Sequence, residues 1–243
     1  MKNLKIFLSH NENSLGGGLK IRDASPIQTE IIYIEDFLRM GNDNLITDND
    51  IIHFSCNSSL IYEILPKIEN FKCHIFNKEF LLNKYKKKDV QLKLNNEGIQ
   101  IPKIYSDFYD ISFPVFCKEN DHTGMAFMAF TRATLEKIFT KFDKANFYLE
   151  KAILDSEKAT KEIKVYYVDG STFGKNGEKI SDEIAKACQK IAKCLDNIEI
   201  FSADFIITSE GQYMIDFNAA VGFYLSNEGR DEFIKSVLKK GEK

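Results

Sequence analysis

One stretch, residues 203–222 (ADFIITSEGQYMIDFNAAVG), constrains the fold of this chain more than any other. Two apolar runs, 204–207 and 213–218, flank a short Ser-Glu-Gly sequence at 209–211, and this pattern predicts an antiparallel hairpin. The hairpin also carries three side chains with oxygen donors, which are Asp204, Asp216 and Asn218.

The length of the loop decides whether these oxygens converge. A two-residue loop ending at Gly211 would pair Asp204 with Phe217, and the two carboxylates would face opposite sides of the sheet. A three-residue loop, with Gly211 in the left-handed conformation of a bulged turn, pairs Asp204 with Asp216 instead. Alternation then puts Asn218 on the same face, which predicts three hard oxygen ligands suited to Mg²⁺ beside a nucleotide phosphate. The same residues also suit the solvated positions of a one-sided hairpin.

The composition is that of a globular protein. Of the 243 residues, 44% are hydrophobic and 28% are charged, with a formal net charge of -3. No global basic field favours a nucleic acid or an anionic membrane as a partner. The N-terminus lacks a leader pattern and no apolar run approaches a spanning length, so we expect a soluble, cytoplasmic protein.

The five cysteines are scattered and form no C-x-x-C pair, which predicts reduced thiols. Cys188 and Cys194 share one helical pattern and are expected to be packing residues. The four histidines lie in different local contexts, so no zinc site of Cys and His is predicted.

The first 83 residues alternate strand and helix patterns. Strands are predicted at 4–8, 30–34, 51–55 and 71–76, with a helix at 60–65. This alternation predicts a small, mainly parallel α/β layer. Three glycines at 16–18 follow the first strand but lack both G-x-x-x-x-G-K-[ST] and G-x-G-x-x-G. We therefore predict a flexible loop there and not a phosphate-binding loop.

Beyond this region the pattern becomes α+β. One charged helix is predicted over 78–96, and helices also at 131–139, 180–195 and through 233–238. Further strands are predicted at 113–118, 125–130, 147–153 and 162–168. Thr131 or Thr134 is the expected N-cap of the helix at 131–139.

Two lysines stand where an anion is readily held. Lys118 ends a predicted strand directly before a turn that contains Gly124, so its ammonium lies next to backbone N–H groups that can approach an anion. Lys164 lies in mid-strand, on the face of Tyr166. If that face also carries the carboxylate pair, the site suits a polyphosphate and its Mg²⁺. Taken singly, each lysine fits an exposed strand position equally well.

The order of these motifs resembles the ATP-grasp superfamily. The motifs are a lysine-rich helix, G-I-x-[IL]-P, F-P-V-x-x-K, a glycine-containing turn, L-E-x-x-I, E-I-K-V-Y-Y-V-D-G and D-F-I-x-T-x-x-G-x-Y-x-I-D-F-N, within residues 84–222. They look most like the carboxylate-amine ligases of the ribosomal-protein glutamate ligase and glutathione synthetase type. The resemblance implies two α+β subdomains, 84–148 and 149–243, that clasp a nucleotide. A small α/β pre-ATP-grasp domain, 1–83, precedes them.

The resemblance also implies roles for the residues that match its motifs. Lys87 matches the first nucleotide-phosphate lysine, with the lysines at 86 and 88 as alternatives. Lys118 matches the second, and Asp121 to Gly124 match the loop that closes over the triphosphate. Lys164 stands where the ligases commonly carry a phosphate-facing arginine, so Lys118 and Lys164 are the expected catalytic residues.

The remaining matches concern the nucleotide base, the ribose and the metal. The hinge strand that meets the adenine edge matches Glu150, Lys151 and Ile153. Glu157 matches a ribose-binding carboxylate, and the Mg²⁺ ligands match Asp204, Asp216 and Asn218.

The resemblance implies an ATP- and Mg²⁺-dependent ligase that activates a carboxylate as an acyl-phosphate and joins it to an amine. Its substrates would be small molecules or a peptide. However, residues 169–181 are far shorter than the region that supplies acceptor strands in the ligases. Two alternatives therefore stay open: a small-molecule phosphotransferase, and a degenerate nucleotide-binding regulatory protein. The substrates, and whether the protein is a homo-oligomer, also stay open.

Overall fold

The computed structural model describes residues 2–10, 15–41, 45–56, 58–121, 125–154, 161–222 and 227–242. The chain divides into two compact units. Unit 1 comprises Met1–Lys84, Lys164–Ala203 and Asn218–Lys243, and unit 2 comprises Tyr85–Ile163 and Asp204–Phe217. The unit boundaries fall within the two strands of the hairpin and do not coincide with the boundaries of the predicted domains 1–83, 84–148 and 149–243. These domains therefore stay a prediction. Within the described residues, no helix is long and apolar enough to cross a membrane.

Unit 1 contains the predicted parallel sheet, with strand order β2-β1-β3-β4. Its strands are β1 (Asn3–Leu8), β2 (Thr29–Tyr33), β3 (Asp50–Phe54) and β4 (His74–Ile75). All residues of β3 and all but the first of β1 are buried, as expected for parallel strands covered on both faces. The predicted strand at 71–76 is reduced to the two residues of β4.

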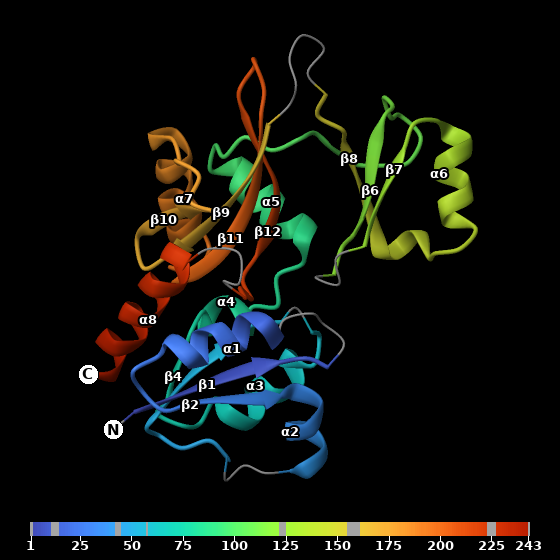
Figure 1. Cartoon of the computed structure of the whole chain (residues 1–243). Coiled ribbons are helices and arrows are strands. Elements are labelled where there is room, and N and C mark those ends of the chain that lie inside the picture. Colours follow the sequence, from blue (N-terminus) through green and yellow to red (C-terminus); the bar gives the residue numbers. More distant parts are fainter. Residues whose placement is uncertain are drawn as a thin grey trace. The chain divides into compact units, whose positions relative to one another are not determined.

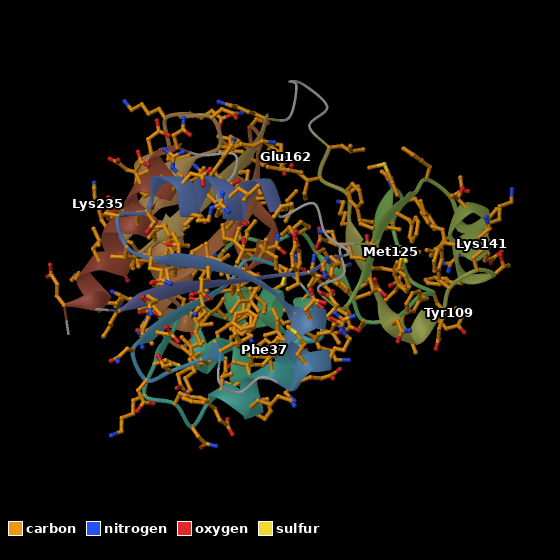
Figure 2. The ribbon with its side chains drawn as sticks, turned by 60° about the horizontal axis from the view of Figure 1, so that its bottom comes forward. Phe37, Tyr109, Met125, Lys141, Glu162 and Lys235 are labelled. Carbon is orange, nitrogen blue, oxygen red and sulfur yellow. The ribbon has the colours of Figure 1, made fainter. Side chains whose placement is uncertain are left out.

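Four helices connect and cover these strands (Figure 1): α1 (Leu15–Ala24), α2 (Ile34–Met40), α3 (Ile61–Ile68) and α4 (Lys78–Leu82). Phe37 of α2 packs against Phe7 with ring centroids 5.4 Å apart, and it lies among the crowded side chains beneath the sheet (Figure 2). On the other face, Ile21 of α1 joins Leu4 and Ile6 in one buried cluster. The predicted α/β layer is therefore confirmed.

The prediction of a flexible loop at the three glycines was wrong, because they lie in helix α1. Gly18 shows the physical reason. A Cβ at this position would lie 3.1 Å from Leu8 Cδ1 and 3.5 Å from Ile31 Cδ1, so glycine lets the helix approach the sheet closely. Contacts with residues distant in sequence thus outweigh the poor helix propensity of glycine.

A second sheet has the order β10-β9-β11-β12. Its strands are β9 (Lys161–Val168), β10 (Ser171–Gly174), β11 (Ile200–Ile207) and β12 (Gln212–Asn218). The predicted Asp169-Gly170 turn joins β9 to β10, with φ of 44° and 99°. Helices α7 (Asp182–Cys194) and α8 (Asn227–Gly241) complete unit 1. Phe233 of α8 joins the same buried cluster as Leu4.

Unit 2 is built around an antiparallel sheet of order β5-β8-β6-β7 (Figure 1). Its strands are β5 (Ile104–Tyr105), β6 (Val115–Glu119), β7 (Ala126–Ala129) and β8 (Phe147–Lys151). Helix α6 (Arg132–Phe139) buries Leu135 against one face of this sheet. Its N-cap is Thr131, whose side chain accepts from Thr134 N. At the outer edge of the unit, the side chain of Tyr109 is exposed (Figure 2).

The single helix predicted over 78–96 is interrupted. Helix α4 ends at Leu82 and a new helix, α5 (Lys87–Asn96), begins five residues later. Between them, Lys84 has a φ of 51°, a left-handed conformation that an α-helix does not contain. Because of the break, helix α5 begins at Lys87, and the position of this helix end sets the point from which the Lys87 side chain extends.

His53 should make the stability of unit 1 depend on pH. Its ring is buried in β3 and hydrogen-bonds through Nε2 to Val221 O at 2.7 Å. Burial lowers the pKa of His53 from 6.5 to about 4, because the charged ring is poorly solvated there. The unfolded chain therefore binds the proton more readily, so stability is full above pH 6.5 and falls as the pH drops towards 4.

Between pH 7 and pH 5 this effect should cost about 2 kcal/mol of unfolding free energy, measured by urea titration. A His53→Gln variant cannot take up the proton and should lose correspondingly less over that range. Asn95→Gln, at an exposed position of α5, is the control, because it changes no ionisable group. Equal pH dependence in His53→Gln and the unmodified protein would contradict this assignment.

Candidate active site

Two lysines of unit 2 reach neighbouring residues of β12. Lys87 Nζ donates to Asp216 Oδ1 at 2.9 Å. Lys118 Nζ donates to Ile215 O at 2.6 Å and to Glu150 Oε1 at 2.7 Å. The lysine side chains are only 11% and 12% exposed. Glu150 is 1% exposed and Asp216 29%, so water screens the Lys118–Glu150 pair less than the Lys87–Asp216 pair. The structure thus brings together four of the residues predicted from the sequence.

The two carboxyl groups respond differently to this environment. Burial raises the pKa of Glu150, and the Lys118 charge only partly opposes it. Burial also acts to raise the pKa of Asp216, but the charge and hydrogen bond of Lys87, helped by Lys118, leave it below its ordinary value. Asp216 therefore carries a negative charge at neutral pH, as a metal ligand must.

A fifth residue of this site, Gln91, was not predicted from the sequence. It lies one turn after Lys87 on α5, is 3% exposed, and its Nε2 donates to Ile215 O at 3.1 Å. The available signal was its i+4 spacing from Lys87, which places both side chains on one helix face. Ile215 O therefore accepts hydrogen bonds from both Gln91 and Lys118.

Among the described residues, two buried oxygens beside Lys118, Gln91 Oε1 and Glu150 Oε2, lack a hydrogen bond of normal geometry, although a side-chain hydrogen bond from Gln91 acts to lower the pKa of Glu150. A buried acceptor without a donor is costly, so the site is short of donors. The exocyclic amino group of adenine carries two N–H donors, and Glu150 lies on the strand matched to the adenine edge. This surplus of acceptors fits an adenine nucleotide.

The turn of the hairpin differs from the predicted one. Thr208 N donates to Gly211 O at 2.9 Å, so the hydrogen bond closes a two-residue loop of Ser209 and Glu210. Gly211 has a φ of 150°, which is not the left-handed helical conformation of the predicted bulged turn. With regular pairing from this turn, Asp204 would lie opposite Ile215, and Asp216 would face the other side of the sheet. The two carboxylates share a face only if a β-bulge lies between the turn and Asp204 or Asp216. Their convergence therefore stays a prediction.

A distant segment of the chain contacts the hairpin beside this turn. Met214 N donates to Gln100 O at 2.9 Å, and a Cβ on Gly211 would lie 2.6 Å from Gln100 Oε1. Gln100 therefore packs directly against the tip of the hairpin. This contact joins residues more than 100 positions apart, so the local turn signal does not reveal it.

Replacing Gly211 with alanine should lower the free energy of unfolding by about 2 kcal/mol, chiefly from backbone strain and to a smaller extent from displacing the end of the Gln100 side chain. Gly170→Ala is the matched control, because Gly170 also has a positive φ but no atom within 4 Å of its ideal Cβ. Urea titration should show a larger loss for Gly211→Ala. Equal losses would mean that Gln100 contributes nothing.

Comparison with known proteins identifies the fold. No family model and no curated protein matches the sequence. A D-alanine–D-alanine ligase from Bacillus anthracis, complexed with ATP, has a TM-score of 0.69 at 12% identity, covering 100% of this chain and 97% of that one. D-cycloserine synthetase DcsG has a TM-score of 0.73 at 10% identity, covering 98% and 99%. The chain has the ATP-grasp fold.

Another structure with this fold is the ATP-grasp ligase PsnB, complexed with a minimal precursor, Mg and ADP. It has a TM-score of 0.66 at 11% identity, covering 99% of this chain and 98% of that one. The predicted resemblance to ATP-grasp ligases, and the predicted α/β and α+β fold class, are confirmed. At such low identity the comparisons establish the fold and leave the roles of individual residues to be tested.

The other residues matched to the ATP-grasp motifs lie in several places. In unit 2, Asp121 follows β6, Lys151 ends β8, Ile153 follows β8 and Asp204 lies in β11. In unit 1, Lys164 lies in β9 and Asn218 ends β12. Gly124 and Glu157 lie outside the described residues.

The residues present suit a magnesium ion that is bound together with a phosphate ligand. No group of three or more His, Cys, Asp and Glu is placed to hold a metal ion in the described part of the chain. Mg²⁺ commonly takes one or two carboxylates and completes its shell with phosphate oxygens and water. The charged Asp216, two residues before Asn218 on β12, fits that pattern.

Proposed function

We propose that this protein is an ATP- and Mg²⁺-dependent ligase that activates a carboxylate as an acyl-phosphate and joins it to an amine. The supporting observation is the partly buried pairing of Lys87 with Asp216, beside that of Lys118 with the buried Glu150. Two partly buried cations next to a charged carboxylate can exchange their partners for the phosphates and metal of a nucleotide.

In this proposal each matched residue has a distinct role. Lys87 and Lys118 bind the phosphates, and Lys164 faces the reacting phosphate. The adenine edge meets Glu150, Lys151 and Ile153, and the ribose meets Glu157. Residues Asp121 to Gly124 cover the triphosphate, and Mg²⁺ is held by Asp204, Asp216 and Asn218.

Bound Mg²⁺–ATP would supply the phosphoryl group that activates the carboxylate. The contribution of the chain is electrostatic: Lys118 and Lys164 stabilise the charge that develops during phosphoryl transfer. Partial burial strengthens this effect, because the Lys118 ammonium is largely shielded from water. The reaction needs no nucleophile from the protein.

The named activities of the structural neighbours support this assignment. They include a D-alanine–D-alanine ligase complexed with ATP and a ligase complexed with a precursor peptide. We infer that this chain also uses ATP and Mg²⁺, with small-molecule carboxylate and amine substrates or a peptide. The proposed architecture comprises an N-terminal domain, 1–83, and two ATP-grasp subdomains, 84–148 and 149–243.

A phosphotransferase on the same scaffold is the second candidate. Strand β10 has four residues, and only residues 175–181 separate it from α7. The ATP-grasp ligases resembled by this chain carry further acceptor strands in that region. A reaction that ends at phosphorylation needs no second acceptor.

A metal-dependent ADP-release screen over amino acids and small carboxylates separates these functions. A ligase should release ADP with a carboxylate, and added hydroxylamine should trap the acyl-phosphate as a hydroxamate. A phosphotransferase should yield a stable phosphorylated product with no amine requirement. ATP binding without ADP release for any substrate would instead favour a regulatory protein.

A further inference from the structure

Asn120 supplies the helix cap that α5 does not have in its own sequence. The N-cap position of α5 is Lys86, whose side chain makes no capping hydrogen bond. Instead, Lys87 N donates to Asn120 O at 3.0 Å and Lys88 N donates to Asn120 Oδ1 at 3.0 Å. Asn120 thus satisfies two N–H groups that a helix start leaves without intrahelical partners.

This tertiary cap offsets an unfavourable local sequence. Three consecutive lysines at 86–88 place positive charge at the positive end of the helix dipole. Only Asp89 in the first turn opposes it. The start of α5, and with it the position of Lys87, therefore depends on a residue that lies more than 30 positions later.

Asn120 is itself fixed to the end of β6. Its backbone N donates to Asn146 O at 2.8 Å, and Glu119 N donates to Met125 O at 2.9 Å. Directly before it, Lys118 and Glu119 lie in register with β8. The same strand end therefore carries Lys118, two residues before Asn120, and anchors the helix that carries Lys87.

The two lysine side chains reach adjacent residues of β12. Lys87 contacts the Asp216 carboxylate and Lys118 contacts Ile215 O. Asn120 joins the two elements from which these side chains start. We propose that Asn120 is a positioning residue that holds Lys87 at the spacing from Lys118 that one polyphosphate requires. This inference rests on the proposed function for its ligand, but the contacts that carry it do not depend on a nucleotide.

The first test needs no nucleotide. Lysine acetylation of the ligand-free protein, followed by mass spectrometry with fragmentation, measures how readily each lysine reacts. In Asn120→Ala, the acetylation rate of Lys87 should rise roughly fivefold, the change expected for loss of a cap. The acetylation rate of Lys118 should not change. Asn120→Asp should restore the slow rate, because its carboxylate still accepts from Lys88 N.

The second test measures binding of a non-hydrolysable ATP analogue with Mg²⁺ by calorimetry. Asn120→Ala should weaken binding roughly fivefold, and Asn120→Asp should recover it. Asn95→Ala is the control, because Asn95 lies exposed near the other end of α5.

The outcomes separate positioning from general stabilisation and from failure of the proposed function. If Asn120→Ala lowers the urea midpoint but leaves Lys87 acetylation and analogue binding unchanged, the positioning role is overturned. If the unmodified protein binds no analogue, the proposed function is wrong. In that case the acetylation rates alone decide whether Asn120 positions Lys87.

Discussion

Replacing Asp216 with asparagine is expected to strengthen the binding of metal-free ATP and to weaken the binding of ATP with Mg²⁺. In the ligand-free protein, Asp216 Oδ1 accepts from Lys87 Nζ at 2.9 Å, so the lysine is neutralised by the carboxylate. Asp216→Asn removes that negative charge and frees Lys87. Metal-free ATP should therefore bind about fivefold more tightly. With Mg²⁺ present, the missing ligand should weaken binding and lower substrate-dependent ADP release by roughly 100-fold or more.

Calorimetry with and without Mg²⁺, together with the ADP-release assay, checks both effects. Asp23→Asn is the matched control, because Asp23 lies in α1 with a side chain 65% exposed. Because the pKa of Asp216 is lowered, its carboxylate is charged at neutral pH. Both assays should therefore compare Asp216→Asn with the unmodified protein at neutral pH. If Asp216→Asn kept full ADP release, Asp216 would not be a metal ligand and the proposed site would be wrong.

Replacing Asn77 with alanine is expected to cause the largest loss of stability. Asn77 is 5% exposed, and its Nδ2 donates to Ile200 O at 2.6 Å and to Ala219 O at 2.8 Å. Its Oδ1 accepts from Glu199 N and Ile200 N, both at 3.0 Å. Asn77→Ala would leave two donors and two acceptors of the backbone unpaired in the interior. The free energy of unfolding should fall by about 4 kcal/mol.

Part of any loss at position 77 comes from the backbone, because Asn77 has a φ of 61°. Asn176→Ala measures that part, since Asn176 has a φ of 70° but is exposed, and it should lose about 1 kcal/mol. Urea titrations of Asn77→Ala and Asn176→Ala check both losses. A loss in Asn77→Ala as small as that in Asn176→Ala would show that the four hydrogen bonds contribute little.

The sequence predicted the parts of the site that have a local signal. Lys118 and Asp216 were recognisable as charged residues within apolar strands, and Lys87 by its place in a lysine-rich helix before a motif. Glu150 was found through the hinge-strand match. The structure places these four together in unit 2.

The features that the sequence did not predict depend on distant partners. Helix α1 approaches Leu8 and Ile31 closely at Gly18, and the turn at Gly211 lies against Gln100. Asn120 caps a helix that begins 33 residues earlier in the chain. Propensity and turn rules describe neighbours in sequence, so they assign a loop to three glycines and overlook a cap supplied by another strand.

Many of the side-chain contacts described above end on the main chain. In the site, Gln91 and Lys118 both donate to Ile215 O, and in unit 1 the four side-chain hydrogen bonds of Asn77 all join backbone atoms. Such contacts survive when evolution replaces the side chain on the accepting residue. The side chain at position 215 can therefore change while the Ile215 carbonyl still accepts the hydrogen bonds from Gln91 and Lys118. This gives a physical reason why chains with this fold can diverge to 10–14% identity and keep a TM-score near 0.7.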